Sequence, residues 1–435
     1  MPRRKVIRQG ERHGGTRSDF ARSRLSLYDQ WMGSSRSTSK THPTQTSGDE
    51  TQPPWWERLD DDFYRSPESF DMDRLDLARA KLAATPDVAI RTLGAYAVAT
   101  MAMPFGYHPG RLRKLAEDQH IYTKAPECGD PTAFFRTPAA GVRITRHRPG
   151  LPYFRPRRGR CFDLQFQSPY QPVNPREREA YGKHRRNRIA HARYWRHEGD
   201  ARPTLIAIHG FSADPYWLNE WFFELPRYFN MGCDVLLVTL PFHGRRKGRL
   251  APFSGHGFFA GGISRMNEAF GQAIFDLRIF LDFLLEDQGA PSVGATGISL
   301  GGYTAALLAA VDERLSFAIP NVPLVSIADL VMEWHPISMA TRGIMGALKL
   351  SLADIRKLVA VHSPLSYPVK LPKERLLIIG GVGDRMAPPK HARLLWEHWD
   401  KPDIHWFAGS HLVHLGRDAY HSRMRSFLRE INFLD

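Results

Sequence analysis

The chain has 435 residues, of which 42% are hydrophobic and 24% are charged, so it can bury a sizeable core and is neither fibrous nor wholly disordered. Its three cysteines lie far apart and form no C-x-x-C pair, which argues against a disulfide scaffold, a zinc ribbon and a thioredoxin-like site. The formal net charge is +15, and no apolar run reaches the roughly 20 residues needed to cross a bilayer.

The positive charge is concentrated in the first half of the chain. Residues 1–200 contain 36 Lys and Arg against 23 Asp and Glu, whereas residues 201–435 contain 24 against 22. The densest stretch is 143–196, with 15 basic and 3 acidic residues. The simpler interpretation of this stretch is a solvated surface, and contact with an anionic surface is the alternative. No nucleic-acid-binding module accompanies it, so we do not expect a nucleic-acid partner.

Residues 1–53 are rich in Arg, Ser, Thr and Gly and contain few apolar residues. They cannot bury enough surface to offset the entropy of the chain, so we predict a disordered basic tail. An Arg- and Ser-rich start is also typical of a mitochondrial presequence, but Glu11, Asp19 and Asp29 argue against one. The apolar core of a secretory signal does not follow the basic start, and we therefore expect a cytoplasmic protein.

A helical or irregular extension is predicted over residues 54–160. Within it, apolar residues recur at three- and four-residue spacings over residues 70–103, which is typical of helices. Pro86 follows Thr85 and suits the first turn of a helix, so we predict that it divides this stretch into two helices. We interpret the extension as a small appendage packed on the main domain. A helix lying on a membrane surface is the alternative.

From residue 161 onwards, short apolar or alternating stretches are separated by helical ones. The run Thr204 to Ile208 is continuously apolar after its first residue, as expected for a central strand of a parallel sheet. The predicted strands are residues 161–167, 188–196, 204–208, 235–240, 293–298, 315–319, 376–379 and 404–407. Strands that alternate with helices predict an α/β fold, with a mostly parallel sheet covered by helices on both faces.

The strand at 293–298 runs into a G-x-S-x-G motif formed by Gly297, Ser299 and Gly301, and an Ala- and Leu-rich helical stretch follows at once. In a sharp turn from strand to helix, side chains at the two glycine positions would collide with neighbouring backbone, whereas the serine hydroxyl projects above the sheet edge. The helix N-terminus beneath it favours negative charge. We therefore predict that Ser299 is a nucleophile.

A serine nucleophile also needs hydrogen-bond donors for the oxyanion that forms when it attacks a carbonyl. The strand 204–208 runs into His209-Gly210-Phe211, where the glycine permits a turn that aims a backbone N–H group at the site. We expect the N–H groups of Phe211 and Leu300 to form this oxyanion hole. His209 is expected to support the loop rather than to take part in the chemistry.

The catalytic acid and base are expected to follow the serine in that order. Asp384 lies just past the strand 376–379, and Asp329 is the reserve candidate for the acid. His411 follows the final strand behind a flexible Gly-Ser pair, and we prefer it to His414, which is expected to begin the terminal helix. A neutral imidazole suits a general base because its unperturbed pKa of about 6.5 lies near the operating pH.

With these motifs, the chain resembles the α/β-hydrolase superfamily over residues 161–435. The resemblance rests on His209-Gly210-Phe211, the turn Gly297-x-Ser299-x-Gly301, Asp384 and His411. It implies a mostly parallel, eight-stranded sheet, a serine mechanism through an acyl-enzyme that uses neither a metal nor a cofactor, and a cap inserted over residues 321–372. The long basic extension before residue 161 departs from the common pattern of the superfamily.

The sequence therefore predicts a serine esterase-like hydrolase that acts on a small-molecule carboxylic ester or thioester. Two alternatives are an acyltransferase or polyester-type enzyme on the same scaffold, and a non-catalytic binding protein that uses its basic N-terminal region. The sequence specifies neither the acyl and leaving groups nor the oligomeric state, and it marks no substrate-binding residues.

Overall fold

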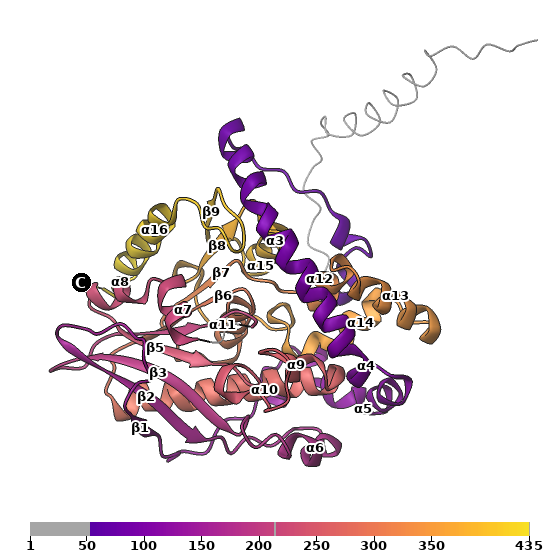
Figure 1. The fold of residues 1–435 in the computed structure, drawn as a ribbon, viewed down its shortest axis with the longest axis horizontal. Helices are drawn as coiled ribbons and strands as arrows, with labels where there is room; N and C mark the ends of the chain where they lie inside the picture. Colours follow the sequence, from indigo (N-terminus) through magenta and orange to yellow (C-terminus); the bar gives the residue numbers. More distant parts are fainter. Residues whose placement is uncertain (1–52, 213–214, 435) are drawn as a thin grey trace, which may run out of the picture. The chain divides into compact units, whose positions relative to one another are not determined.

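A nine-stranded sheet organises the part of the chain that the computed structural model describes, residues 53–212 and 215–434 (Figure 1). The strands are β1 (Thr145–His147), β2 (Gly159–Gln167), β3 (Ile189–His197), β4 (Thr204–Ile208), β5 (Asp234–Thr239), β6 (Val293–Ile298), β7 (Ala318–Asn321), β8 (Leu377–Gly381) and β9 (Asp403–Phe407). Their order across the sheet is β1-β2-β3-β5-β4-β6-β7-β8-β9. The pairs from β1 to β3 and the pair β3·β5 are antiparallel, and all pairs from β5 to β9 are parallel. The predicted α/β fold is confirmed.

The sheet has one strand more than the eight that the resemblance implies. The additional strand, β1, is three residues long, and all three of its side chains are exposed. It extends the antiparallel edge by pairing with residues 163–165 of β2. A strand of this length with no buried face lacks the alternation of apolar and polar residues by which strands are predicted, so the sequence gives no signal for it.

The other predicted strands agree with the structure to within a few residues. Every residue of β4, β5 and β6 is buried, as the continuous apolar runs indicate. The largest difference is at β7, which begins at Ala318 rather than at the predicted residue 315 and ends at Asn321. Proline and asparagine are rare in strand interiors. The sequence therefore does not indicate that β7 continues through Pro320 and Asn321.

Helices cover both faces of the sheet. They are α2 (Trp55–Arg58), α3 (Arg74–Met101), α4 (Met103–Gly106), α5 (Pro109–Cys128), α6 (Arg178–Gly182), α7 (Tyr216–Phe222), α8 (Leu225–Asn230), α9 (His256–Phe259), α10 (Gly262–Asp282), α11 (Leu300–Val311), α12 (Ile327–Glu333), α13 (Ile337–Leu348), α14 (Leu352–Val359), α15 (Pro389–His398) and α16 (Arg417–Glu430). Alternate residues of β4 pack into two separate cores: Ile206 and Ile208 pack with α10 and α11, and Leu205 and Ala207 with α8 and α16.

The predicted break at Pro86 is wrong, because α3 runs unbroken for 28 residues with Pro86 inside it. Proline removes the hydrogen bond to the carbonyl four residues earlier, here that of Leu82. Both Pro86 and Leu82 are exposed, so water can hydrate this carbonyl. The helix is also stabilised at its start, where the Asp73 side chain accepts a hydrogen bond from the Asp76 N–H.

The solvent-facing side of helix α3 carries apolar side chains among charged ones such as Arg79 and Lys81. The exposed apolar side chains include Leu75, Leu82, Leu93 and Tyr96. No helix in the described part of the chain is long and apolar enough to cross a membrane. The predicted basic tail, residues 1–53, falls almost wholly outside the described residues.

Three helices, α12, α13 and α14, fill the stretch between β7 and β8 that the resemblance assigns to a cap. A buried ion pair joins two of them: Arg356 of α14 donates two hydrogen bonds to the Asp329 carboxylate of α12, at 2.6 and 2.9 Å. Arg356 also donates to the carbonyls of Leu59 and Asp60. One fully buried guanidinium therefore ties the inserted helices to the segment that follows α2.

We expect Arg356→Met to lower the free energy of unfolding by about 3–5 kcal/mol, because it leaves the Asp329 carboxylate buried and unpaired. Equilibrium unfolding in urea measures this loss. The double variant Arg356→Met/Asp329→Leu should regain much of it, and Lys183→Met in an exposed pair with Glu179 should leave stability unchanged. Equal losses in the single and double variants would contradict this account of the pair.

Candidate active site

Ser299 occupies a strained turn between β6 and α11. Its φ of 58° and ψ of −117° lie in a region that residues other than glycine rarely adopt. Two hydrogen bonds hold this backbone: the Ser299 N–H donates to Asn321 O at 3.0 Å, and the Tyr303 N–H donates to Ser299 O at 2.9 Å. The Ser299 side chain is partly exposed. A serine forced into this conformation at the carboxyl end of a central strand is typical of a nucleophile elbow.

Gly297 and Gly301 are in positions where no side chain fits. A Cβ atom on Gly297 would lie 2.2 Å from Gly301 O, and one on Gly301 would lie 1.9 Å from Ile208 O. The second distance shows that the turn after β6 presses against the end of β4. The crowding thus comes from the neighbouring strand as well as from the turn itself.

The loop after β4 lies beside Ser299. A Cβ atom on Gly210 would lie 3.5 Å from the Ser299 Cβ atom. Neither the Phe211 N–H nor the Leu300 N–H donates a hydrogen bond to another described residue. Two unpaired backbone donors next to a nucleophile suit an oxyanion hole.

His209 is buried and supports this loop. Its Nε2 accepts a hydrogen bond from the Leu240 N–H at 3.0 Å, so the ring proton is on Nδ1, which lies 2.7 Å from Gly210 O. The imidazole therefore links the loop after β4 to the end of β5.

The two residues predicted as acid and base are in direct contact. The Asp384 Oδ2 atom lies 2.6 Å from His411 Nδ1, and both side chains are buried. The other Asp384 oxygen accepts from the N–H groups of Met386 and Ala387, each at 2.8 Å. Asp384 follows β8 and His411 follows β9, which are neighbouring parallel strands, so the two loops meet at one sheet edge.

Burial lowers the pKa of His411, but the charge and hydrogen bond of Asp384, with the charge of Asp87, outweigh that effect. The pKa of His411 is consequently raised above its ordinary value. An imidazole with a raised pKa holds a proton more firmly than a free imidazole does.

Asp329 and His414, the alternative candidates for the acid and the base, form other contacts. Asp329 pairs with Arg356 and accepts a hydrogen bond from Ser326 Oγ. His414 contacts the Tyr420 hydroxyl and the carbonyl of His411, and burial lowers its pKa to about 3. The geometry therefore favours Asp384 over Asp329 and His411 over His414.

The structure does not join the serine to the histidine by a hydrogen bond: none links Ser299 Oγ and His411 among the residues it describes. Two strands, β7 and β8, lie between β6, which Ser299 follows, and β9, which His411 follows, and Asn321 at the end of β7 accepts the hydrogen bond of the Ser299 N–H. Catalytic hydrogen bonds are often long before substrate binds. No group of three or more His, Cys, Asp or Glu side chains in the described ranges is arranged to hold a metal ion.

Sequence reasoning missed one contact at this site. Helix α3 of the N-terminal extension packs directly on the loop that carries Asp384, where a Cβ atom on Gly383 would lie 2.3 Å from Ala80 O. The buried side chain of Asp87, on the same helix, reaches the loops of both Asp384 and His411. The only signal in the sequence is an aspartate within residues 82–90, a mostly apolar run of the helical stretch.

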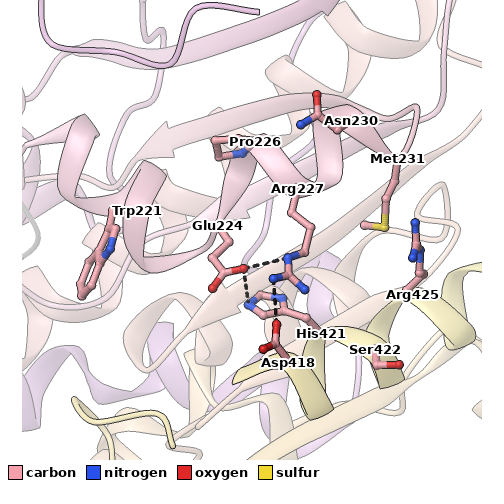
Figure 2. A pocket seen from close by; sticks show the side chains of 10 residues that line it. All are labelled: Trp221, Glu224, Pro226, Arg227, Asn230, Met231, Asp418, His421, Ser422 and Arg425. Atoms are coloured by element: carbon pink, nitrogen blue, oxygen red, sulfur yellow. Dashed lines mark hydrogen bonds and ion pairs between the residues drawn. The ribbon is translucent and has the colours of Figure 1, made fainter. Parts of the chain in front are cut away.

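A separate hollow of about 820 Å³ lies between α8 and α16 (Figure 2). Three of its charged side chains pair with one another, since Arg227 contacts Glu224 at 2.8 Å and Asp418 at 3.0 Å, and the His421 ring lies 3.5 Å from Glu224. None of its lining residues is a predicted site residue. The internal ion pairs are typical of a structural network, and we assign the hollow no role in the chemistry.

Two curated relatives, from two strains of Mycobacterium tuberculosis, are each 27% identical to this chain over 302 residues. Both are described as uncharacterised proteins. The match covers 65% of this chain and 66% of each relative, which is slightly less than two thirds of the relatives' length. No protein-family model matches the chain.

Among solved structures, an acetyl xylan esterase from a Thermoanaerobacterium species superposes with a TM-score of 0.51 at 16% sequence identity. The superposition covers 73% of this chain and 98% of that esterase. An acetyl xylan esterase from a Paenibacillus species has a TM-score of 0.49 at 15% identity and covers 73% of this chain and 99% of its own. At this level of identity, the first superposition shows a shared fold.

We expect Gly301→Ala to destabilise the protein by about 1–3 kcal/mol or more, because the added methyl group would meet the carbonyl of Ile208 at 1.9 Å. Thermal unfolding measures the effect. The matched control is Gly343→Ala in α13, where no atom lies within 4 Å of the added Cβ atom, and it should leave the melting temperature unchanged or slightly higher. Equal stability of the two variants would argue against the close approach of β4 and the turn.

Proposed function

Because the chain has the α/β-hydrolase fold, we propose that it is a serine hydrolase that cleaves a carboxylic ester or thioester through an acyl-enzyme. The proposal is carried by one observation: a strained, partly exposed Ser299 and a buried His411–Asp384 pair follow strands of the same parallel run, β6, β8 and β9. Carboxyl ends of parallel strands share one edge of a sheet, which is where α/β proteins bind their substrates.

In the proposed first step, His411 Nε2 takes the hydroxyl proton as the Ser299 Oγ atom attacks the carbonyl carbon of the substrate. The N–H groups of Phe211 and Leu300 donate to the oxyanion of the tetrahedral intermediate. The intermediate collapses, the bond to the leaving alcohol or thiol breaks, and His411 returns the proton to that group. An acyl group then remains on Ser299.

The second step is the reverse of the first, with a water molecule in place of the leaving alcohol or thiol. His411 removes a proton from water, the hydroxide attacks the acyl carbon, and the carboxylic acid departs while Ser299 regains its proton. Asp384 accepts the Nδ1–H of His411 at 2.6 Å, which keeps Nε2 unprotonated and free to act as the base.

An ester or thioester substrate is supported by the fold shared with an acetyl xylan esterase at a TM-score of 0.51. It is further supported by the residues at the site, since a serine, an imidazole and two backbone donors suit acyl transfer. Transfer to an alcohol or thiol acceptor would use the same first step, so product analysis with an added alcohol distinguishes an acyltransferase from a hydrolase.

We expect a fluorophosphonate probe to label the wild-type protein at Ser299, where Oγ displaces fluoride from phosphorus. Peptide mass spectrometry identifies the labelled residue. Ser299→Ala should abolish labelling and ester hydrolysis while the protein stays folded. Ser422→Ala, at the hollow between α8 and α16, is the matched control and should be labelled like the wild type. A folded wild-type protein that the probe does not label would refute the proposal.

We expect kcat/KM for a short-chain p-nitrophenyl ester to rise with pH. His411 acts as a base only when neutral, and its raised pKa keeps it protonated to a higher pH than a free imidazole. The midpoint of the acid limb should therefore lie above about 6.5. Initial rates between pH 5 and 9 measure it, and a midpoint well below that value would contradict the proposed pairing with Asp384.

A further inference from the structure

Helix α3 lies across the two loops that carry the proposed acid and base. It passes β8, β9 and α15 (Figure 1), and its contacts reach both loops. The Arg91 guanidinium donates to the Arg385 carbonyl at 2.8 Å, and Ala80 packs against Gly383. The helix belongs to the extension that departs from the common α/β-hydrolase pattern.

Asp87, in the middle of α3, has a carboxylate with no exposed surface. Its Oδ1 atom accepts hydrogen bonds from Ser410 Oγ at 2.9 Å and from the Leu412 N–H at 3.1 Å. Its Oδ2 atom accepts from the His411 N–H at 2.8 Å and from the Arg385 N–H at 3.1 Å. All four donors lie in the loops of Asp384 and His411.

The partners of this carboxylate are unusual for a buried charge. No Lys, Arg or His side chain forms an ion pair with Asp87 among the described residues. Three of its four donors are backbone N–H groups, and the fourth is a hydroxyl. Burying a carboxylate without a cation is unfavourable unless hydrogen bonds compensate for the lost water. Here those hydrogen bonds hold the two loops in place.

We propose that Asp87 is a positioning residue for the reaction: through Oδ2 it holds the backbone of His411 and of Arg385, the residue next to Asp384, and so sets the placement of the base relative to the acid. This inference rests on the proposed function. Because the same oxygen accepts from both loops, neither can move away from the other without losing a hydrogen bond. A helix outside the sheet thereby supports the site through one buried side chain.

An amide cannot replace this carboxylate. A carboxylate offers two acceptor oxygens, whereas the side chain of asparagine offers one oxygen and an NH₂ group that only donates. In Asp87→Asn, two of the four donors would face that NH₂ group and lose their partners. The loops would then settle at a slightly different separation, and small displacements of catalytic groups reduce rates strongly.

Asp87 also acts on the base through its charge. The titratable groups that face His411 are Asp384 from the loop after β8, Asp87 from α3, and His414 from its own loop. The two aspartates raise the pKa of His411 against the effect of burial. His414, whose pKa is lowered to about 3, is neutral over the working range of pH. Removing the charge of Asp87 should therefore lower the pKa of His411.

The test is the pH profile of ester hydrolysis by the full chain carrying Asp87→Asn. We expect kcat to fall by about 10- to 100-fold with KM nearly unchanged, because Asp87 touches the loops of the base and not the substrate. We also expect the acid limb of kcat/KM to move to lower pH. The matched control is Asp76→Asn on the same helix, which pairs with the exposed Arg79 and should change neither quantity.

Two further variants separate positioning from general stability. Asp87→Glu keeps the charge and should leave the acid limb near that of the wild type, although kcat falls. Ser410→Ala removes one donor to Asp87 and should slow labelling by a fluorophosphonate, even if Asp87→Asn does not fold.

An acid limb that stays in place in Asp87→Asn, with activity lost only in proportion to the unfolded fraction, would overturn the inference and leave the proposed function intact. A wild-type protein that neither reacts with the probe nor hydrolyses esters would overturn both. Unchanged labelling of folded Ser410→Ala, together with an inactive and unfolded Asp87→Asn, would also count against positioning.

Discussion

Close approach between β4 and the turn after β6 is the constraint on which the site depends. The two strands pair in parallel, and the space between Gly301 and the carbonyl of Ile208 admits no side chain. This crowding forces Ser299 into a backbone conformation that serine rarely adopts, and the Asn321 carbonyl at the end of β7 stabilises it with a hydrogen bond. The same contact brings the loop after β4, where the Phe211 N–H donates to no described residue, beside the serine.

The part of the site that contains Asp384 and His411 is organised by hydrogen bonds rather than by steric crowding. The His411–Asp384 pair is buried at the ends of β8 and β9, and its loops are held together from outside the sheet by α3. One half of the site is thus shaped by steric exclusion within the sheet, and the other by a buried carboxylate from the extension. The two halves are linked through β7, whose last residue, Asn321, pairs with Ile379 of β8.

The sequence was most informative where one local pattern determines the structure. Continuous apolar runs predicted β4 and β6 nearly residue for residue, and the G-x-S-x-G spacing identified the turn at Ser299. It was misleading at Pro86, because tertiary contacts, which a local pattern does not show, can keep a helix intact across a proline. No periodic pattern in the sequence indicates the role of Asp87, whose hydrogen-bond partners lie 298 to 325 residues further along the chain. Contacts of that range leave no periodic signal.

The four hydrogen bonds of Asp87 also affect whether the N-terminal extension and the sheet can be exchanged separately between related proteins. Residues Pro53–Asp435 form one unit, and the sheet by itself would leave four donors beside His411 without their acceptor. The extension and the sheet are therefore not independent modules. Replacing the first 160 residues with those of a relative would also replace the helix that supports His411. Selection on the proposed site would then act on a helix that contributes no atom to the proposed chemistry.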